Sequence, residues 1–198
     1  MTRVLFLVLL LLTNSCFGGA NAQAAKEPTF KHVALQGEVN DAMATKVILG
    51  ILLAPMGPEK TRPDGIIIDI DSGGGDFDAG FEIVKAIEAS PIPVICVVDG
   101  QADSMAFYIL QSCDQRVMTR RSSLMWHGIT LVGGSGVNMV NLPGLQKRLE
   151  VMNEAALAHV SHRLKIPASE VAEKIKYGDW WMAATEALKI GAVDSLIR

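Results

Sequence analysis

Two nearly continuous apolar runs constrain the fold of this chain more than any other feature. Residues 65–70 read Gly-Ile-Ile-Ile-Asp-Ile, and residues 94–98 read Val-Ile-Cys-Val-Val. Such β-branched runs are typical of strands that are covered on both faces of a parallel sheet. Each run leads through a glycine-containing loop into a segment whose apolar residues recur at helical spacing. Because alternating strands and helices require right-handed crossovers, the sequence predicts an α/β fold built around a parallel sheet.

Further elements are predicted on both sides of these runs. Strands are expected at residues 32–37, 116–119, 124–126 and 193–197, and helices at 41–53, 78–89, 104–113, 145–164, 167–176 and 183–190. Residues 99–103 and 178–181 are interpreted as turns. Asn40 and Asp78 are expected to cap the helices that follow them, and Gly191 to end the last helix. The longest helix has one apolar stripe and should pack against the domain; the stripe consists of Leu145, Leu149, Met152, Ala156 and Val160.

The first residues have the outline of a secretory signal peptide. Arg3 precedes an apolar run at residues 4–12, which as a helix would rise only about 13 Å and is too short for a hydrocarbon core of ~30 Å. Ala20-Asn21-Ala22 has the small residues that a leader peptidase recognises. The sequence therefore predicts export, with a mature chain that begins near Gln23.

The chain is expected to divide into a signal peptide at residues 1–22, an exposed lead at 23–31 and one globular domain at 32–198. A composition with 49% apolar and 20% charged residues suits a domain with a real core. The net charge of −3 becomes more negative without the leader, which argues against a nucleic-acid partner. A buried N-terminal helix and lipid attachment at Cys16 are the alternatives to a cleaved leader.

Two cysteines remain in the expected mature chain. Cys96 lies in an expected strand and Cys113 in an expected helix, and both are interpreted as small buried hydrophobes. An oxidising compartment would permit them to pair. The sequence alone does not place them at bonding distance, so their pairing is left open.

Ser104 is the first candidate for chemistry, since it follows a strand and begins a predicted helix. Unpaired N–H groups and the helix dipole at that position suit a nucleophile. The Met105 N–H and an N–H from the loop at residues 72–75 would then stabilise an oxyanion. The ordinary alternative is that Ser104 is a helix N-cap.

His127 and Asp179 are the candidates for the groups that would activate this serine. His127 ends a strand, so its imidazole should leave the sheet at the rim. Asp179 precedes two tryptophans, where a carboxylate needs a hydrogen-bond donor such as a histidine N–H. A buried structural histidine and an aspartate that caps a turn are the alternatives. The poorer candidates for a base are His32, His159 and His162.

Neither a cofactor nor a metal is predicted. The loop at 72–75 lacks the Lys-Ser/Thr that ends a P-loop, and it does not match the dinucleotide pattern G-x-G-x-x-G. His159 and His162 lie three residues apart on one helix without a third ligand at zinc spacing. The predicted chemistry therefore uses protein side chains alone.

Four segments of the chain, in this order, resemble the Clp protease proteolytic subunit: residues 70–75 (Ile-Asp-Ser-Gly-Gly-Gly), 100–105 (Gly-Gln-Ala-Asp-Ser-Met), 125–127 (Met-Trp-His) and 179–187 (Asp-Trp-Trp-Met-Ala-Ala-Thr-Glu-Ala). The resemblance extends over about residues 33–197. It implies a ClpP/crotonase-like spiral of right-handed βαβ units with a protruding handle helix, and subunits assembled in homo-oligomeric rings. It also implies a catalytic triad and an oxyanion hole, which fall on Ser104, His127 and Asp179 and on the N–H groups of Gly74 and Met105.

Three positions depart from the family pattern. Gly73 replaces a proline, Asp103 stands where the family has a small residue, and Ala106 replaces a glycine. The glycine loosens the loop that carries an oxyanion donor, and an added carboxylate beside Ser104 disfavours an oxyanion.

The leader places the protein outside the cytoplasm, periplasmic or secreted, where no ATP-driven partner is expected. The leading hypothesis is therefore an ATP-independent serine endopeptidase that cleaves peptides or unfolded protein segments through an acyl-enzyme. Three alternatives are kept. They are a Ser-Lys protease of the signal-peptide-peptidase type with Lys147 as base, an acyl-CoA enzyme of the crotonase type, and a non-catalytic assembly or binding module.

Overall fold

The computed structural model describes residues 26–130 and 138–198. The leader predicted at 1–22, Cys16 and the start of the predicted lead lie outside the described residues. Within the described part of the chain, no helix has the length and apolar character needed to cross a membrane.

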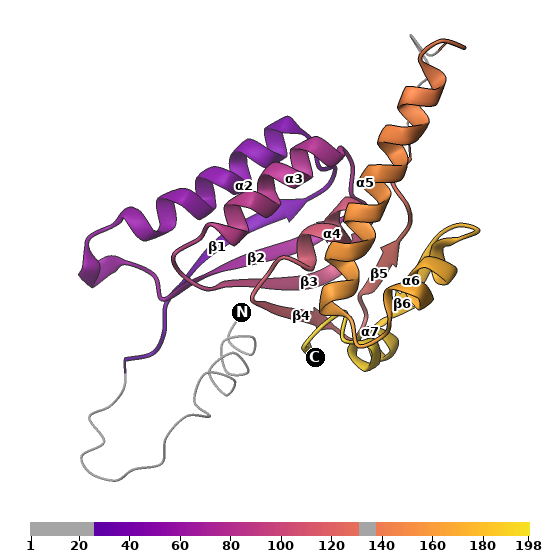
Figure 1. Ribbon diagram of the computed structural model, residues 1–198. Coiled ribbons are helices and arrows are strands. Elements are labelled where there is room, and N and C mark those ends of the chain that lie inside the picture. Colours follow the sequence, from indigo (N-terminus) through magenta and orange to yellow (C-terminus); the bar gives the residue numbers. More distant parts are fainter. Residues whose placement is uncertain (1–25, 131–137) are drawn as a thin grey trace.

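A parallel sheet forms the centre of the molecule (Figure 1). Its strand order is β1-β2-β3-β4-β7, and every neighbouring pair in that order is parallel, as predicted. The bounds are β1 Phe30–Gln36, β2 Gly65–Ser72, β3 Val94–Asp103, β4 Gln115–Thr119 and β7 Ser195–Ile197. β5 (Ser123–Trp126) pairs in parallel with the end of β3, and β6 (Trp180–Ala183) runs antiparallel to β5.

Six α-helices within the described residues connect these strands: α2 Asp41–Leu53, α3 Phe77–Glu88, α4 Met105–Leu110, α5 Leu142–Arg163, α6 Ala168–Ile175 and α7 Ala184–Ile190. Short 3₁₀ turns follow α2 at Ala54–Met56 and Glu59–Thr61. As expected, the Asn40 side chain caps α2 by accepting a hydrogen bond from the Met43 N–H, and α7 ends at Gly191 with a φ of 77°. α5 begins at Leu142 instead of the predicted Leu145, and one end of it projects beyond the sheet (Figure 1).

The two faces of the sheet are packed unequally. The main core lies on the face covered by the helices and includes Leu35, Ile68, Val98 and Phe107. The opposite face carries a smaller cluster of five buried residues: Ile67, Ile95, Val97, Val117 and Ile197. β2 and β3 contribute to both clusters, which explains why their sequences are almost continuously apolar.

Three local predictions were wrong. Residues 100–103 were expected in a turn, but β3 continues to Asp103, because it leaves β4 after Val98 and pairs with β5 from Gln101. α3 begins at Phe77 and is capped by Asp76 instead of Asp78, since the Asp76 side chain accepts from the Ala79 N–H.

The third error concerns the predicted turn at 178–181, where Trp180 and Trp181 instead begin β6. Their side chains alternate between a buried and an exposed position, as a strand edge requires.

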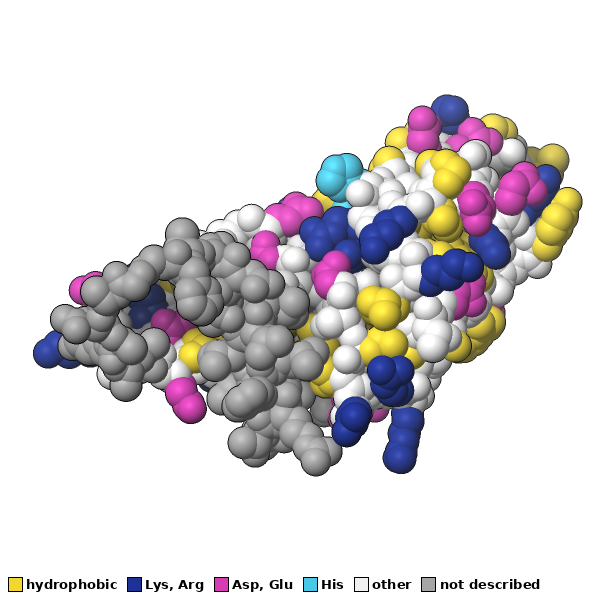
Figure 2. Space-filling view, turned by 90° about the horizontal axis from the view of Figure 1, so that it is seen from below, with side chains coloured by type: hydrophobic (Ala, Val, Ile, Leu, Met, Phe, Trp, Pro, Cys, Tyr) yellow, Lys and Arg dark blue, Asp and Glu magenta, His cyan; other side chains and the backbone are white. Residues whose placement is uncertain are grey.

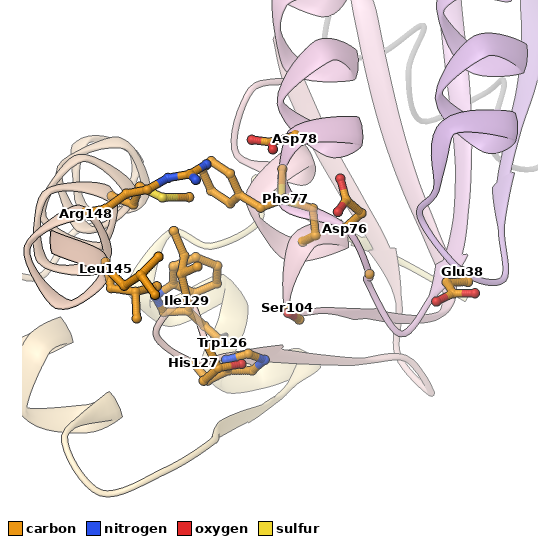
Figure 3. Close-up of a pocket in the computed structure, with 15 residues that line it drawn as sticks. Glu38, Asp76, Phe77, Asp78, Ser104, Trp126, His127, Ile129, Leu145 and Arg148 are labelled. Atoms are coloured by element: carbon orange, nitrogen blue, oxygen red, sulfur yellow. The ribbon is translucent and has the colours of Figure 1, made fainter. Parts of the chain in front are cut away.

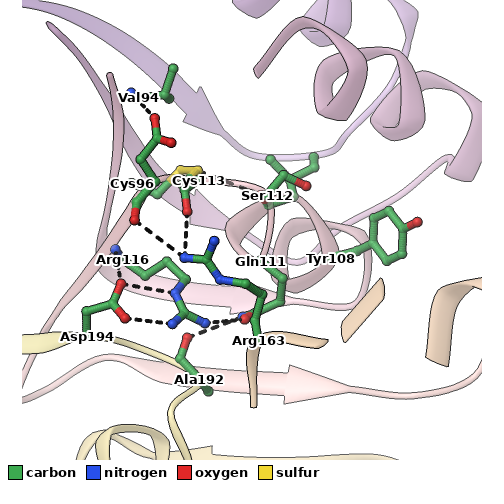
Figure 4. Close-up of a disulfide and its surroundings, with 12 residues drawn as sticks. Val94, Cys96, Tyr108, Gln111, Ser112, Cys113, Arg116, Arg163, Ala192 and Asp194 are labelled. Atoms are coloured by element: carbon green, nitrogen blue, oxygen red, sulfur yellow. Dashed lines mark hydrogen bonds and ion pairs between the residues drawn. A yellow bond between two sulfur atoms is a disulfide. The ribbon is translucent and has the colours of Figure 1, made fainter. Parts of the chain in front are cut away.

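A disulfide joins Cys96 of β3 to Cys113 after α4 (Figure 4). This settles the pairing that the sequence left open. Both cysteines are completely buried, in agreement with their interpretation as core residues. The bond ties together the strand that leads to Ser104 and the helix that follows it.

The surface carries charges of both signs. On the face shown in Figure 2, Lys and Arg side chains lie among Asp and Glu side chains, with apolar side chains between them. On the described part of this face the two signs are therefore interspersed.

Candidate active site

Ser104 lies at the junction of β3 and α4 in a strained backbone conformation. Its φ of 52° and ψ of −117° make it the only non-glycine residue with a positive φ among those that the structure describes. Such a conformation costs about 1–3 kcal/mol and persists only where the surrounding structure holds it. Here the Ser104 N–H donates to the Met125 carbonyl of β5 at 2.8 Å, and its carbonyl accepts from the Tyr108 N–H. The sharp strand-to-helix turn resembles the nucleophile elbow of the α/β-hydrolase fold.

Ser104 opens into a pocket of about 590 Å³ between α3, the end of β5 and α5 (Figure 3). Asp76, Phe77 and Asp78 lie on one side of Ser104, and Leu145 and Arg148 of α5 form the opposite wall. His127 and Trp126 come from the end of β5. The pocket therefore combines a candidate nucleophile with walls that are partly apolar and partly charged.

The candidate oxyanion donors differ from the sequence prediction at one position. The Gly74 N–H already donates to the Ser72 Oγ at 3.1 Å, and that hydroxyl donates to the Gly37 carbonyl. Gly75 lines the pocket instead, and its N–H has no hydrogen-bond partner among the described residues. Within the same part of the chain the Met105 N–H is also free, as is usual in the first turn of a helix.

Gly74 nevertheless shapes the site. Its φ is +87°, and a Cβ at this position would lie 2.8 Å from both the Met105 nitrogen and the Ser104 Cβ. Only glycine allows this close approach, so the loop after β2 packs directly against the strand-to-helix turn.

His127 is half-buried at the carboxyl end of β5 and lines the same pocket as Ser104. Its Nδ1 lies 2.5 Å from the Gly128 carbonyl oxygen, so Nδ1 carries the proton and donates it to that carbonyl. The other ring nitrogen, Nε2, is then the unprotonated one, which is the tautomer that a general base needs. Within the described part of the chain, no hydrogen bond joins His127 to Ser104 or to Asp179.

Asp179 lies immediately before β6, on the side of the sheet edge where β5 ends. Trp126 pairs with Trp180 at the end of the antiparallel ladder, so His127 and Asp179 are the residues that adjoin this last pair. The Asp179 side chain is exposed, and its charge acts on Asp103.

Asp103, the residue before Ser104, is an unusual neighbour for a nucleophile. It is only 4% exposed, and its Oδ1 has no hydrogen-bond partner among the described residues. Burial, together with the negative charges of Asp179 and Asp71, raises the pKa of Asp103 to about 6. The sequence flagged this position, and the structure shows a buried carboxyl that resists ionisation.

The other candidate bases do not face Ser104. Lys147 is exposed on α5 and pairs with Glu150 at 3.3 Å, outside the pocket. His32 pairs with Asp69, His159 with Ser112, and neither lines the pocket; His162 does not line it either. Among the described residues, no group of three or more His, Cys, Asp or Glu side chains could hold a metal.

The walls of the pocket could not be assigned from the sequence. The first half of the predicted apolar stripe of α5, Leu145, Leu149 and Met152, lines it, whereas Ala156 and Val160 are buried in the core. The helical periodicity predicted the stripe, but it did not show that one part lines the pocket and the other part packs in the core. No sequence pattern indicated that Ile129 and Arg148 belong to the site, because only the tertiary arrangement brings them into the same pocket as Ser104.

Comparisons with known proteins match this architecture. A family model described as Clp protease covers residues 24–198. The chain is 30% identical over 170 residues to the ATP-dependent Clp protease proteolytic subunit 3 of Rhodococcus jostii (strain RHA1), covering 83% of this chain and 80% of that protein. It is 31% identical over 143 residues to the proteolytic subunit 1 of Chlamydia muridarum, covering 70% and 73% of the two chains.

The fold agrees as well. The structure of a ClpP1 mutant from Listeria monocytogenes superposes with a TM-score of 0.75 and 22% identity, covering 85% of this chain and 91% of the other. The predicted α/β ClpP-like fold is thus confirmed. The protein is a serine-type peptidase, a hydrolase. More specifically, it belongs to the Clp protease family.

Proposed function

We propose that this protein is an ATP-independent serine endopeptidase that cleaves peptides or unfolded protein segments, with Ser104 as nucleophile, His127 as general base and Asp179 as the residue that orients it. The observation that carries the proposal is the strained backbone of Ser104, which opens into the pocket that His127 also lines. A serine that merely capped α4 would have an extended backbone and a side chain that accepts from the helix N–H groups, and Ser104 has neither.

In the proposed reaction, the Ser104 Oγ attacks the peptide carbonyl carbon while the His127 Nε2 takes its proton. The N–H groups of Gly75 and Met105 stabilise the resulting oxyanion. The protonated His127 then gives its proton to the leaving amine, which leaves an acyl-enzyme on Ser104. Water, activated by the same imidazole, hydrolyses that ester.

Asp179 enters the proposal through the register of β5 and β6. The proposal requires a side-chain rotation that brings its carboxylate to Nδ1, which now donates to the Gly128 carbonyl. A carboxylate at Nδ1 would stabilise the imidazolium that forms during proton transfer.

Export and independence from ATP are part of the same proposal. The leader outline at residues 1–22 supports export, and the Cys96–Cys113 disulfide supports an oxidising compartment. Outside the cytoplasm no ATP-driven unfoldase is expected, so substrates would be short or already unfolded. The projecting α5 and the membership of the Clp protease family support a homo-oligomeric ring.

The test is fluorophosphonate labelling of the mature chain from Gln23, read by intact mass, together with casein cleavage in the absence of ATP. We expect one label on the wild type, none on Ser104→Ala, and a loss of cleavage of at least ~10³-fold in that variant. Ser112→Ala is the matched control, because Ser112 also pairs with a histidine, His159, at 3.2 Å but lies outside the pocket.

Two outcomes would contradict the proposal. Labelling that survives Ser104→Ala would place the nucleophile elsewhere. A folded, assembled wild type that neither labels nor cleaves would favour the non-catalytic assembly module.

A further inference from the structure

The segment that follows His127 is held by a side chain from α5. Residues 127–130 belong to no strand, so their backbone groups lack the ladder bonds that hold β5. Asn153 supplies the missing bonds at Ile129: its Oδ1 accepts from the Ile129 N–H at 2.7 Å, and its Nδ2 donates to the Ile129 carbonyl at 3.2 Å. One amide therefore replaces a strand neighbour.

The Asn153 side chain is itself fixed. It is half-buried, and its Nδ2 also donates to the Leu149 carbonyl one turn earlier in α5 at 2.9 Å. Its oxygen and both amide hydrogens are thus engaged, so rotation of the amide would break every bond at once. The clamp ties the post-His127 segment to a rigid helix.

Gly128 completes the arrangement. A Cβ at residue 128 would lie 2.9 Å from the Asn153 Oδ1, so a larger residue there would displace the amide. The carbonyl of this same Gly128 accepts the hydrogen bond from the His127 Nδ1. The contacts therefore run from α5 through Asn153 and the backbone at 128–129 to the imidazole.

We propose that Asn153 is a positioning residue for His127: by clamping the backbone at Ile129, it holds the Gly128 carbonyl where it fixes the tautomer and orientation of the imidazole. Asn153 does not line the pocket and touches no reacting atom, so it acts only through Gly128. The role rests on the proposed function of His127 as base. Misplacing a catalytic group by about 1 Å can cost ~10²-fold in rate.

The variants Asn153→Ala and Asn153→Asp test this role. Alanine removes the clamp, whereas aspartate keeps the acceptor for the Ile129 N–H and, at neutral pH, loses the donor to the Ile129 carbonyl. We expect kcat to fall ~10–100-fold in Asn153→Ala with KM changed less than about threefold, and Asn153→Asp, which keeps the acceptor for the Ile129 N–H, to lose less activity than Asn153→Ala. Glu154→Ala, a change at an exposed neighbour on α5, should leave both constants unchanged.

The readout that does not depend on activity is the nitrogen NMR spectrum of the His127 ring, assigned with His127→Gln. The wild type should show one tautomer with the proton on Nδ1, and Asn153→Ala should show a mixture. Gly128→Ala should shift the spectrum in the same direction, and its effect should not add to that of Asn153→Ala.

A folded Asn153→Ala with the wild-type His127 spectrum and pH-rate profile would overturn the inference. Loss of stability alone, with the spectrum unchanged, would also overturn it, because the clamp would then be only structural. An inactive wild type with the expected change in the spectrum would instead contradict the proposed function and leave the clamp standing.

Discussion

Two polar clusters adjoin the two ends of α4, and they differ in how completely their polar groups are hydrogen-bonded or ion-paired. Arg116 is 4% exposed, and it forms a bidentate pair with Asp194, with contacts of 2.6 and 3.1 Å, and donates to Gln111 at 2.7 Å (Figure 4). Among the described residues, the cluster around Ser104 instead contains the unpartnered Asp103 Oδ1, two free backbone N–H groups and an Asp179 that forms no hydrogen bond with His127.

The difference indicates that the first cluster stabilises the fold, whereas the second is arranged for function. A cluster in which the buried charge is fully paired contributes to a single native structure, since removal of one partner leaves that charge uncompensated. An incompletely paired cluster keeps donors and acceptors available for a substrate. Because α4 joins the two clusters, the first holds in place the residues that the second leaves unpaired.

Breaking the paired cluster should have the largest effect. Burial alone would raise the pKa of Asp194, but the hydrogen bonds and charge of Arg116 outweigh it and hold that pKa below its ordinary value. Asp194→Asn leaves the charge of the buried Arg116 without its partner, but the Asp194 side chain is itself 40% exposed to water. We therefore expect the free energy of unfolding to fall by the lower part of the range for a broken buried pair, about 3–4 kcal/mol at pH 7, measured by urea denaturation.

The pH dependence gives the sign of this contribution. A lowered pKa in the folded state means that the stability is present above the ordinary aspartate pKa and is lost as the pH falls through the folded value. The wild type and Asp194→Asn should therefore converge in strong acid. Asp99→Asn, a change at an exposed aspartate of the same strand β3, should change stability by less than about 0.5 kcal/mol; equal losses in the two variants would contradict the distinction.

Removing the disulfide should have the next largest effect. Cys96 and Cys113 are 17 residues apart, and closing a loop of that length stabilises a protein by about 3 kcal/mol. The double variant Cys96→Ala/Cys113→Ala should lose about that much in urea denaturation. Wild type that is reduced while unfolded and then refolded under reducing conditions should show the same loss. An unchanged urea midpoint in both the double variant and the reduced wild type would refute the prediction.

Removing the unpartnered carboxyl of Asp103 should have the smallest effect on stability, and this change should stabilise the protein. The folded pKa of Asp103, about 6, lies above the ordinary value, so the wild type loses stability as the pH rises from about 4 through 6. Asp103→Asn should therefore be more stable by about 1–2 kcal/mol at pH 8 and about equally stable at pH 4. Thermal unfolding at the two pH values measures the difference, and a variant destabilised at pH 8 would show that the Asp103 charge is compensated.

Several elements could be predicted from the sequence because their signals are local. The β-branched runs of β2 and β3, the Asn40 cap and the Gly191 stop each depend on residues within a few positions. The predicted turn at 178–181 failed because the pairing of Trp180 with Trp126 comes from a strand far earlier in the chain. The predicted turn at 99–103 failed for the same reason. β3 continues to Asp103 because it pairs there with β5, which follows later in the chain.

The candidate site divides in the same way. Ser104, His127 and Met105 were found from strand ends and a helix start, and all three line one pocket. Gly74 was predicted as an oxyanion donor, but the Ser72 hydroxyl occupies its N–H, and only the folded loop turns Gly75 to the pocket. The sequence offered no sign of the Asn153 clamp, because an asparagine on a helix is ordinarily solvated.

The sequence by itself determined the alternation of strands and helices, the order of the candidate catalytic residues and the presence of an unusual aspartate beside Ser104. Those features depend on periodicity and on short segments. Only the tertiary structure decided that Cys96 reaches Cys113, that Asn153 binds the backbone of Ile129 and that Asp103 is too buried to ionise freely. Each of these depends on distances of a few ångströms between residues far apart along the chain, and such distances exist only after the sheet and helices have packed.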